Sequence, residues 1–415
     1  MRSPIVLGAF LALLTPAGLL AQRTDLPPIE KVAEALDNYP SVAAARARVD
    51  AARADRDMLA KGSHEIAVAG SYVRRSVDRE GGYDEFDATI TRPFRLPGKA
   101  ALDREAGALG IEVAENRMED ARHQAALLLS GHWNDWLVAG GLYRNDLDTA
   151  RWLEKELSAL RRRVALRDAA ALDVDRATAA LAQAQAQVAI SLAAREQARV
   201  TLAANFPEIP LPVEPPETSL PELPPQGLAA MRELVIERSH EIRAADREAQ
   251  RLAVVARRVR ADRIADPSFG VRLFSERSGM EQGAGVVMSM PLGGGHRRAA
   301  AERASAEGNA AQLEHMMVQR EIRAIADADL SNATLRLEAW KSADLSAQSA
   351  GDALARTERG YQLGQIDLVD LLYARRQAGE ARRSEVMARS EAVRALLRLE
   401  IDSHSLWVRH DDDGE

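Results

Sequence analysis

The sequence contains no cysteine. Disulfide bonds, thiolate metal ligands, a cysteine nucleophile and lipidation of an N-terminal cysteine are therefore excluded. Aromatic residues make up only 4% of the 415 residues, which is too few for a typical compact α/β enzyme of this length. The 55 basic and 62 acidic residues give a net charge of −7, so no basic excess is available for binding nucleic acid. We expect no nucleic-acid partner.

Long hydrophobic runs are also scarce. The apolar run 5–14 follows a short basic segment and precedes small residues that end at Ala21, the pattern of a cleaved secretory signal peptide. No later segment approaches the roughly 18 consecutive apolar residues that a transmembrane helix needs. The sequence predicts a signal peptide over 1–21 and a mature protein that leaves the cytoplasm without a transmembrane helix.

Stretches rich in Ala, Leu, Arg, Glu and Gln dominate the rest of the chain and are typical of long helices and coiled coils. The chain also repeats itself. An offset of 197 residues pairs Gly98 with Gly295, Leu157 with Leu354, Arg162 with Arg359, Leu166 with Leu363 and Asp173 with Asp370. Two halves, 22–205 and 227–405, therefore share one layout. The segment 206–226 between them holds eight of the 17 prolines and is expected to be an extended connector.

Each half is expected to contain a helix, a pair of strands, a very long helix and a further helix. The first helices are expected over 28–61 and 228–264, and the alternating segments at about 65–94 and 268–292 predict β-hairpins. The long helices, about 99–166 and 296–363, would each extend on the order of 100 Å. Apolar residues at 153, 157, 160 and 164 form a coiled-coil seam. An acidic tail, 406–415, follows.

The strands have the length needed to cross a bilayer, since about 9–11 residues suffice for a tilted strand. Four strands are too few to close a membrane barrel, and an open edge in lipid would leave backbone groups unpaired. Either the four strands form a soluble sheet, or several protomers pool their strands in one barrel. The spacing of the strands does not choose between these arrangements.

The run Arg359–Leu372, R-G-Y-Q-L-G-Q-I-D-L-V-D-L-L, is the most specific motif. Together with the duplicated layout it resembles the TolC-like outer-membrane efflux factor family. The turn Leu-Pro-Gly-Lys at 96–99 is similar to that of the heavy-metal-resistance (CzcC-like) branch. The equivalent turn of the first half, 164–168, lacks the Tyr and Gly of the motif, and Tyr373 replaces an acidic residue that is usual there.

The resemblance implies a mainly α-helical fold with a small β part. A long coiled-coil helical barrel in the periplasm would continue into four membrane strands per protomer, which close a 12-stranded outer-membrane β-barrel in a homotrimer. The channel would contact outer-membrane lipid, dock on a periplasmic adaptor protein and an inner-membrane pump, and conduct substrate without performing chemistry.

The resemblance also suggests site residues. Asp173, Asp370 and Tyr361 would form the pore constriction, where rings of carboxylates favour cations. The alternative is that both Asp residues serve the first turns of their helices, and that Tyr361 is a buried seam residue. Leu166, Leu363 and Gly364 would contact the adaptor at the tip, or would simply form the turns.

No catalytic constellation stands out. The Gly-rich run 293–298 lacks phosphate-loop spacing, and the eight His form no metal-binding pair. His410 and the three following Asp residues are interpreted as a solvated tail. We expect no enzyme activity, no cofactor and no bound metal.

The leading hypothesis is an outer-membrane channel for tripartite export of heavy-metal cations. Drugs, or proteins in type I secretion, are alternative cargoes for the same fold. A periplasmic coiled-coil adaptor or scaffold, with a small soluble sheet, is the alternative from a different class.

Overall fold

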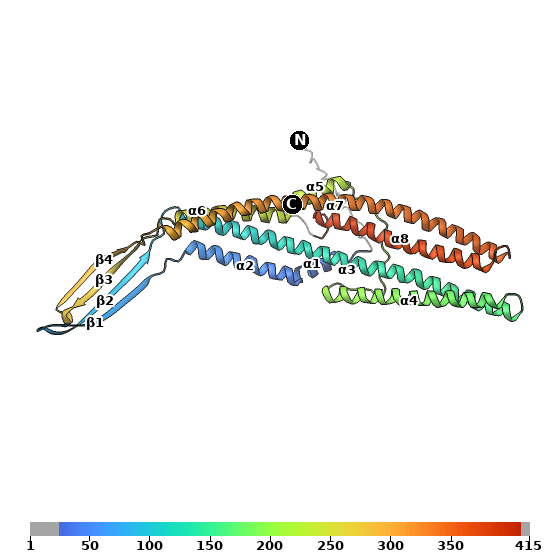
Figure 1. Ribbon diagram of the computed structural model, residues 1–415, viewed down its shortest axis with the longest axis horizontal. Helices are drawn as coiled ribbons and strands as arrows, with labels where there is room; N and C mark the ends of the chain where they lie inside the picture. The colour runs from blue at the N-terminus through green and yellow to red at the C-terminus, as the bar shows by residue number, and fades with distance from the viewer. Residues whose placement is uncertain (1–24, 408–415) are drawn as a thin grey trace, which may run out of the picture.

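The computed structural model describes residues 25–407 and shows an elongated molecule with a β-sheet at one end and a helical bundle over the rest (Figure 1). The expected signal peptide and all but the first two residues of the acidic tail lie outside the described residues. The helices are α1 (Ile29–Asn38), α2 (Pro40–Lys61), α3 (Lys99–Ala165), α4 (Ala171–Asn205), α5 (Leu228–Arg238), α6 (His240–Ala261), α7 (Gly295–Gln362) and α8 (Leu368–Asp402), with one 3₁₀ turn, Arg277–Gly279.

The sheet contains β1 (Ala67–Val77), β2 (Gly81–Pro93), β3 (Ser268–Glu276) and β4 (Glu281–Ser289), in the order β1-β2-β3-β4 and all antiparallel. The two hairpins come from different halves of the chain and join through β2 and β3, where Ile90 lies opposite Val271. The expected fold class, mainly helical with four antiparallel strands, is confirmed.

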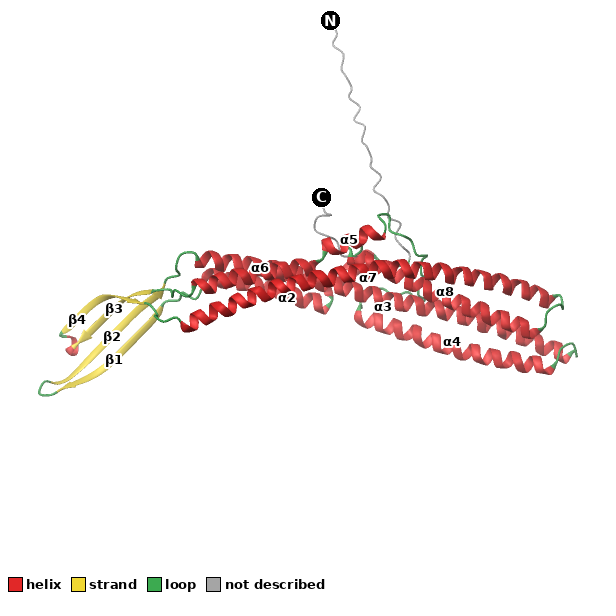
Figure 2. Cartoon of the chain, turned by 45° about the horizontal axis from the view of Figure 1, so that its top comes forward, coloured by secondary structure: helices red, strands yellow, loops and turns green. Residues whose placement is uncertain are grey.

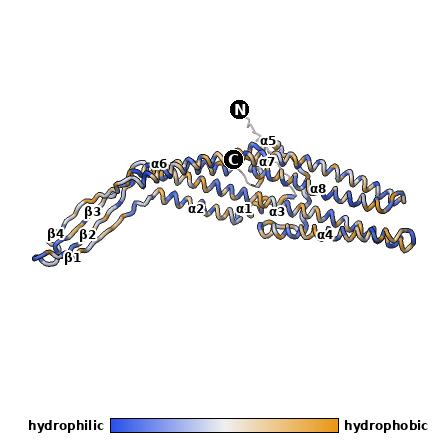
Figure 3. The backbone as a smooth tube through the Cα atoms, viewed as in Figure 1, coloured by the Kyte–Doolittle hydropathy of each residue, from blue (hydrophilic) through white to orange (hydrophobic). Residues whose placement is uncertain are grey.

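Two uninterrupted helices, α3 and α7, extend from the sheet to the far tips (Figure 2). Helices α2 and α4 lie one after the other along α3, and α6 and α8 lie in the same way along α7. Hydrophobic and hydrophilic residues are mixed along every helix (Figure 3), as expected for helices that pack through one face. Near the tips, Leu157 and Leu160 of the predicted seam pack with Leu354, Leu368 and Leu371.

The expectation of one continuous first helix in each half is wrong. Pro40 is the first residue of α2, and its ring fixes the preceding Tyr39 in an extended conformation with ψ 133°, which separates α1 from α2. In the second half Ser239 separates α5 from α6, because its hydroxyl accepts a 3.1 Å hydrogen bond from the Ile242 N–H and caps α6. Both breaks lie at mid-length.

The largest apolar core also lies at mid-length. Leu36, Leu129, Trp136 and Phe206 are completely or almost completely buried there. The proline-rich segment packs against α3 at this level, where Arg144 donates a 2.8 Å hydrogen bond to the Pro215 carbonyl.

None of the described helices combines the length and the apolar character needed to cross a membrane.

Candidate functional site

Two short turns form the tips of the molecule at the end far from the sheet (Figure 1). The turn between α3 and α4 and the turn between α7 and α8 have the same backbone hydrogen bonds, shifted by 197 residues. Asp168 N–H bonds to Arg163 O at 2.8 Å, and Gln365 N–H bonds to Gly360 O at 2.9 Å. Both turns need a left-handed residue, which is Gly364 at φ 73° in the second and Arg167 at φ 61° in the first.

Tyr361, the predicted constriction residue, joins the two tips. Its hydroxyl donates a 3.0 Å hydrogen bond to Glu156 Oε1 and accepts a 3.1 Å hydrogen bond from the Arg163 guanidinium. Arg163 also bonds to the Asp168 carboxylate at 3.0 Å. One phenol on α7 is therefore tied to two charged side chains of α3.

The environment of Tyr361 favours its neutral form. Partial burial and the adjacent Glu156 carboxylate raise the pKa of Tyr361 to about 12, although Arg163 acts in the opposite direction. The hydrogen bond to Asp168 raises the pKa of Arg163 above its ordinary value. At neutral pH the tip therefore contains an intact phenol between a carboxylate and a guanidinium.

Asp173 and Asp370 lie in the first turns of α4 and α8, as the repeat predicts. Asp370 is exposed, and Asp173 lies 3.7 Å from the Arg176 guanidinium of its own helix. Within residues 25–407 no hydrogen bond or ion pair joins Asp173 to Asp370. The side chain that caps α8 is Asp367, whose carboxylate accepts a 2.9 Å hydrogen bond from the Asp370 N–H.

The outermost side chains of both tips are apolar. Leu166 is 80% exposed and Leu363 is 62% exposed, with Leu172 and Val369 also exposed beside them. Apolar side chains of this size at the end of a bundle mark a contact surface more often than a solvated one.

Sequence reasoning missed Arg163, Glu156 and Asp367. The capping role of Asp367 has a visible signal, because an Asp directly precedes an apolar-periodic helix. Arg163 and Glu156 carry no signal of their own, since they look like any other charged residues on a helix surface. Their role depends on Tyr361, which is about 200 residues away in the chain.

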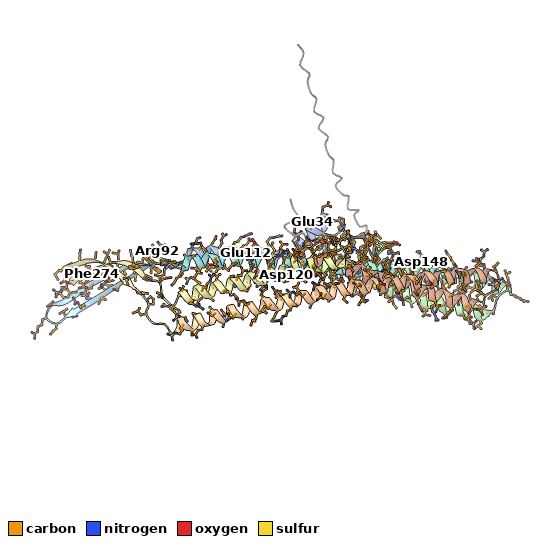
Figure 4. All side chains as sticks on the ribbon, turned by 90° about the horizontal axis from the view of Figure 1, so that it is seen from above. Glu34, Arg92, Glu112, Asp120, Asp148 and Phe274 are labelled. Atoms are coloured by element: carbon orange, nitrogen blue, oxygen red, sulfur yellow. The ribbon has the colours of Figure 1, made fainter. Side chains whose placement is uncertain are left out.

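The sheet has two chemically different faces. One row across all four strands contains Val68, Ile90, Val271 and Val286, which are directly paired and 51 to 85% exposed. The neighbouring rows add Tyr72, Phe86, Leu273, Phe269 and Met288, all exposed. The opposite face carries polar groups, including an ion pair between Asp87 and Arg272. No described element covers the apolar face (Figure 4, in which Phe274 labels the sheet).

A second group of titratable residues lies inside the bundle at mid-length. Asp402, at the end of α8, lies 2.9 Å from His123 of α3, and Arg398 bonds to Asp329 of α7 at 3.0 Å. Burial and the neighbouring Asp402 carboxylate raise the pKa of Asp329 to about 7. Burial alone would lower the pKa of His123, but its hydrogen bond to Asp402 raises it. Among the residues that the structure describes, no three His, Asp or Glu side chains are arranged to hold a metal ion.

Comparison with protein-family models gave no match, and comparison with curated protein sequences gave none either. Solved structures, however, are similar over nearly the whole chain. The outer-membrane channel OprN has a TM-score of 0.75 at 20% identity, with 91% of this chain and 90% of that chain covered. CusC, whose structures concern folding and transmembrane channel formation, has a TM-score of 0.74 at 14% identity, with 90% and 91% covered.

The open state of the MtrE outer-membrane channel of Neisseria gonorrhoeae is similar as well. Its TM-score is 0.74 at 16% identity, and 93% of this chain and 90% of that chain are covered. At these identities the likeness concerns the arrangement of helices and strands. The chain has the fold of the TolC-like outer-membrane channels.

Proposed function

We propose that this protein is the outer-membrane channel of a tripartite export system. The exposed apolar face of the sheet carries this proposal. Strands of 9 to 13 residues with one apolar face have the length and pattern of membrane-crossing strands. The chain performs no chemistry of its own and passively conducts what its partners deliver.

The channel is a homotrimer. Strands β1 and β4 each pair with one neighbour only among the described residues, so the sheet has two free edges. Free edges are not tolerated in lipid, and joining β4 of one protomer to β1 of the next removes them. Three protomers then supply twelve strands, a barrel of ordinary size. The likeness to solved outer-membrane channels supports this arrangement.

A periplasmic scaffold with a soluble sheet is less well supported, because such a sheet would need its apolar face covered. Membrane fractionation separates the two functions. A channel resists carbonate extraction from the outer membrane and has a detergent-corrected mass of three protomers. A monomer released by carbonate would contradict the channel and support the scaffold.

The helical tips face the periplasm and receive substrate from an adaptor protein and an inner-membrane pump. Leu166, Leu363 and Gly364 contact the adaptor, and their exposure supports this role. Tyr361 braces the tunnel mouth in its closed state. Asp173 and Asp370 contribute six carboxylates in the trimer, and a ring of like charges in a narrow passage attracts cations.

The cargo that fits these carboxylates is a heavy-metal cation. Deletion of the gene in its host, followed by growth in zinc, cobalt, cadmium and copper and in dyes and antibiotics, tests this assignment. Sensitivity confined to metals supports it. Sensitivity confined to drugs would assign the channel to multidrug export.

A planar-bilayer measurement tests the role of the two aspartates. We expect the Asp173→Asn/Asp370→Asn variant to lose cation preference, seen as a shift of the reversal potential toward zero in a salt gradient. Asp175→Asn is the matched control, because Asp175 is exposed on another face of the same helix. An unchanged reversal potential in the double variant would show that these carboxylates do not line the constriction.

A further inference from the structure

A pocket of about 360 Å³ lies between the end of α6 and the beginning of α7, beside the junction of the bundle with the sheet. Its walls carry three arginines, with a hydroxyl and an amide as further donors. The lining residues are Arg260, Arg263, Arg298, Ala301, Glu302, Ser305, Ala306 and Asn309. The pocket is thus rich in groups that hydrogen-bond to an anion.

The three arginines lack acidic partners within the described part of the chain. Arg260 donates one long hydrogen bond of 3.4 Å to the Ser305 hydroxyl, and no ion pair involves Arg263 or Arg298. Neighbouring arginines behave differently. Arg257 pairs with Glu105 at 2.7 Å, and Arg303 pairs with Glu307 at 2.8 Å. The pocket therefore concentrates positive charge that the protein itself leaves uncompensated.

The pocket lies next to the apolar face of the sheet. That face ends at Met288, Met290 and Leu292, which are exposed, and α7 begins three residues later at Gly295. Arg298 is in the first turn of α7, and Ser305 follows roughly 10 Å further along the helix axis. The headgroup layer of a bilayer extends about 5–7 Å beyond the hydrocarbon on each side. Arg92 labels the same junction in Figure 4.

The duplication shows that helix packing alone does not demand these arginines. Helices α2 and α3 form the equivalent pair in the first half. Aligned with the second half, their positions carry Ala60, Ser63 and Ala101 in place of the three arginines. The basic pocket is present in one half only.

We infer that this pocket binds the phosphate of an anionic lipid headgroup in the periplasmic leaflet of the outer membrane. The inference rests on the proposed function, because only an embedded sheet brings the pocket to headgroup depth. Arginine guanidinium groups bind phosphate oxygens in a bidentate manner, and the Ser305 hydroxyl and Asn309 amide add donors. Glu302, also in the wall, opposes the anion.

Native mass spectrometry of the detergent-solubilised trimer with added phosphatidylglycerol tests the inference. We expect the Arg260→Ala/Arg263→Ala/Arg298→Ala variant to bind this lipid on the order of 100-fold more weakly than the unchanged protein. Arg303→Ala is the matched control, because Arg303 lies on α7 close by but is paired with Glu307. Its binding should be unchanged. Phosphatidylcholine, which has no net charge, should bind weakly to all variants.

Two further arms keep the test decisive. Glu302→Gln should bind phosphatidylglycerol several-fold more tightly, which a generally damaged fold would not produce. Millimolar inorganic phosphate should fail to displace the lipid. Displacement by phosphate would identify a free-anion site and overturn the lipid assignment. Equal lipid binding by the triple variant would overturn the inference while leaving an outer-membrane channel intact. Release of the protein by carbonate would overturn the proposed function, and the inference with it.

Discussion

The hydroxyl of Tyr361 donates a 3.0 Å hydrogen bond to Glu156, and this contact fastens the second helical hairpin to the first close to the tips. The Arg163 guanidinium approaches the same oxygen at 3.1 Å from the other side. The two tips are thus coupled through one oxygen atom. Separating them requires breaking two charge-assisted hydrogen bonds together.

The first prediction follows from that coupling. Tyr361→Phe keeps the ring in the seam but removes both hydrogen bonds, at a cost of about 2 kcal/mol to the closed arrangement. We expect a higher single-channel conductance in planar bilayers. Tyr373→Phe is the control, because the Tyr373 hydroxyl bonds only to Gln377 of its own helix, at 2.9 Å. Equal conductance of the Tyr361→Phe variant and the unchanged protein would contradict the bracing role.

The second prediction concerns alkaline pH. Because the folded pKa of Tyr361 is about 12 and the ordinary value is 10.0, the folded state holds the phenol proton more tightly than the unfolded state. Its contribution to stability is complete below pH 10 and is lost as the pH rises toward 12. The absorbance difference at about 295 nm between the unchanged protein and Tyr361→Phe should therefore appear only near pH 12. Ionisation near pH 10 would show that the phenol is not held at the tip.

The third prediction concerns the buried pair Asp329 and Asp402. The folded pKa of Asp329 is about 7 against an ordinary 3.8, so its neutral form stabilises the fold at low pH. That stability is lost as the pH rises from about 4 to 7, and between pH 5 and 8 the loss is of the order of 2 kcal/mol. His123, which faces Asp402, Asp120 and Glu241, acts in the same direction because its pKa is also raised.

Asp329→Asn should therefore flatten most of the decline in thermal stability between pH 5 and 8, leaving the smaller part due to His123. Asp327→Asn is the matched control on the same helix, since Asp327 is exposed and pairs with Arg232 at 2.9 Å. A decline of the same size in both variants would show that Asp329 does not hold the proton.

The fourth prediction compares the two tip turns. Arg167 adopts the left-handed conformation that Gly364 adopts in the second turn, and a side chain is disfavoured there by about 1 kcal/mol. Arg167→Gly should slow hydrogen exchange of the Asp168 N–H several-fold, and Gly364→Ala should speed exchange of the Gln365 N–H. Each unmutated turn is the internal control for the other. Opposite signs would show that backbone conformation does not limit these turns.

The fifth prediction tests the two faces of the sheet. Ile90→Arg places a charge in the middle of the apolar face, and at the midplane of a bilayer this costs about 2–4 kcal/mol. We expect loss of outer-membrane assembly, measured as the trimer recovered from the membrane fraction. Ser71→Arg is the control on the other face, where residue 71 lies directly opposite Asp87. Normal assembly of Ile90→Arg would contradict an apolar face in lipid.

Much of the fold is predictable from local pattern. The period-2 alternation around Ile90 and Val271 indicates the strands, and the 4-3-4 spacing around Leu157 indicates the seam, because both patterns record which face is apolar. The pairing of Gly364 with Arg167 follows from the 197-residue offset. The breaks at Pro40 and Ser239 were missed, since the apolar pattern continues through them.

The candidate site is less predictable. Tyr361 and Asp370 belong to a recognisable run of sequence, whereas Arg163 acquires its role only from a side chain on another helix. The mid-length cluster shows the same limit. His123, Asp329 and Asp402 are spread over 280 residues of sequence, and only the antiparallel return of α8 brings the third beside the first two.

The continuity of α3 and α7 has a mechanical consequence. Every other helix starts or ends near mid-length, so only these two cross that level unbroken. Bending stiffness is therefore lowest there, and a sideways force at the tips concentrates its strain at the level of Trp136. Each half of the bundle then moves as a stiff lever about this waist. A small rotation at the waist becomes a large sideways movement at the tips, roughly in proportion to the length of the lever.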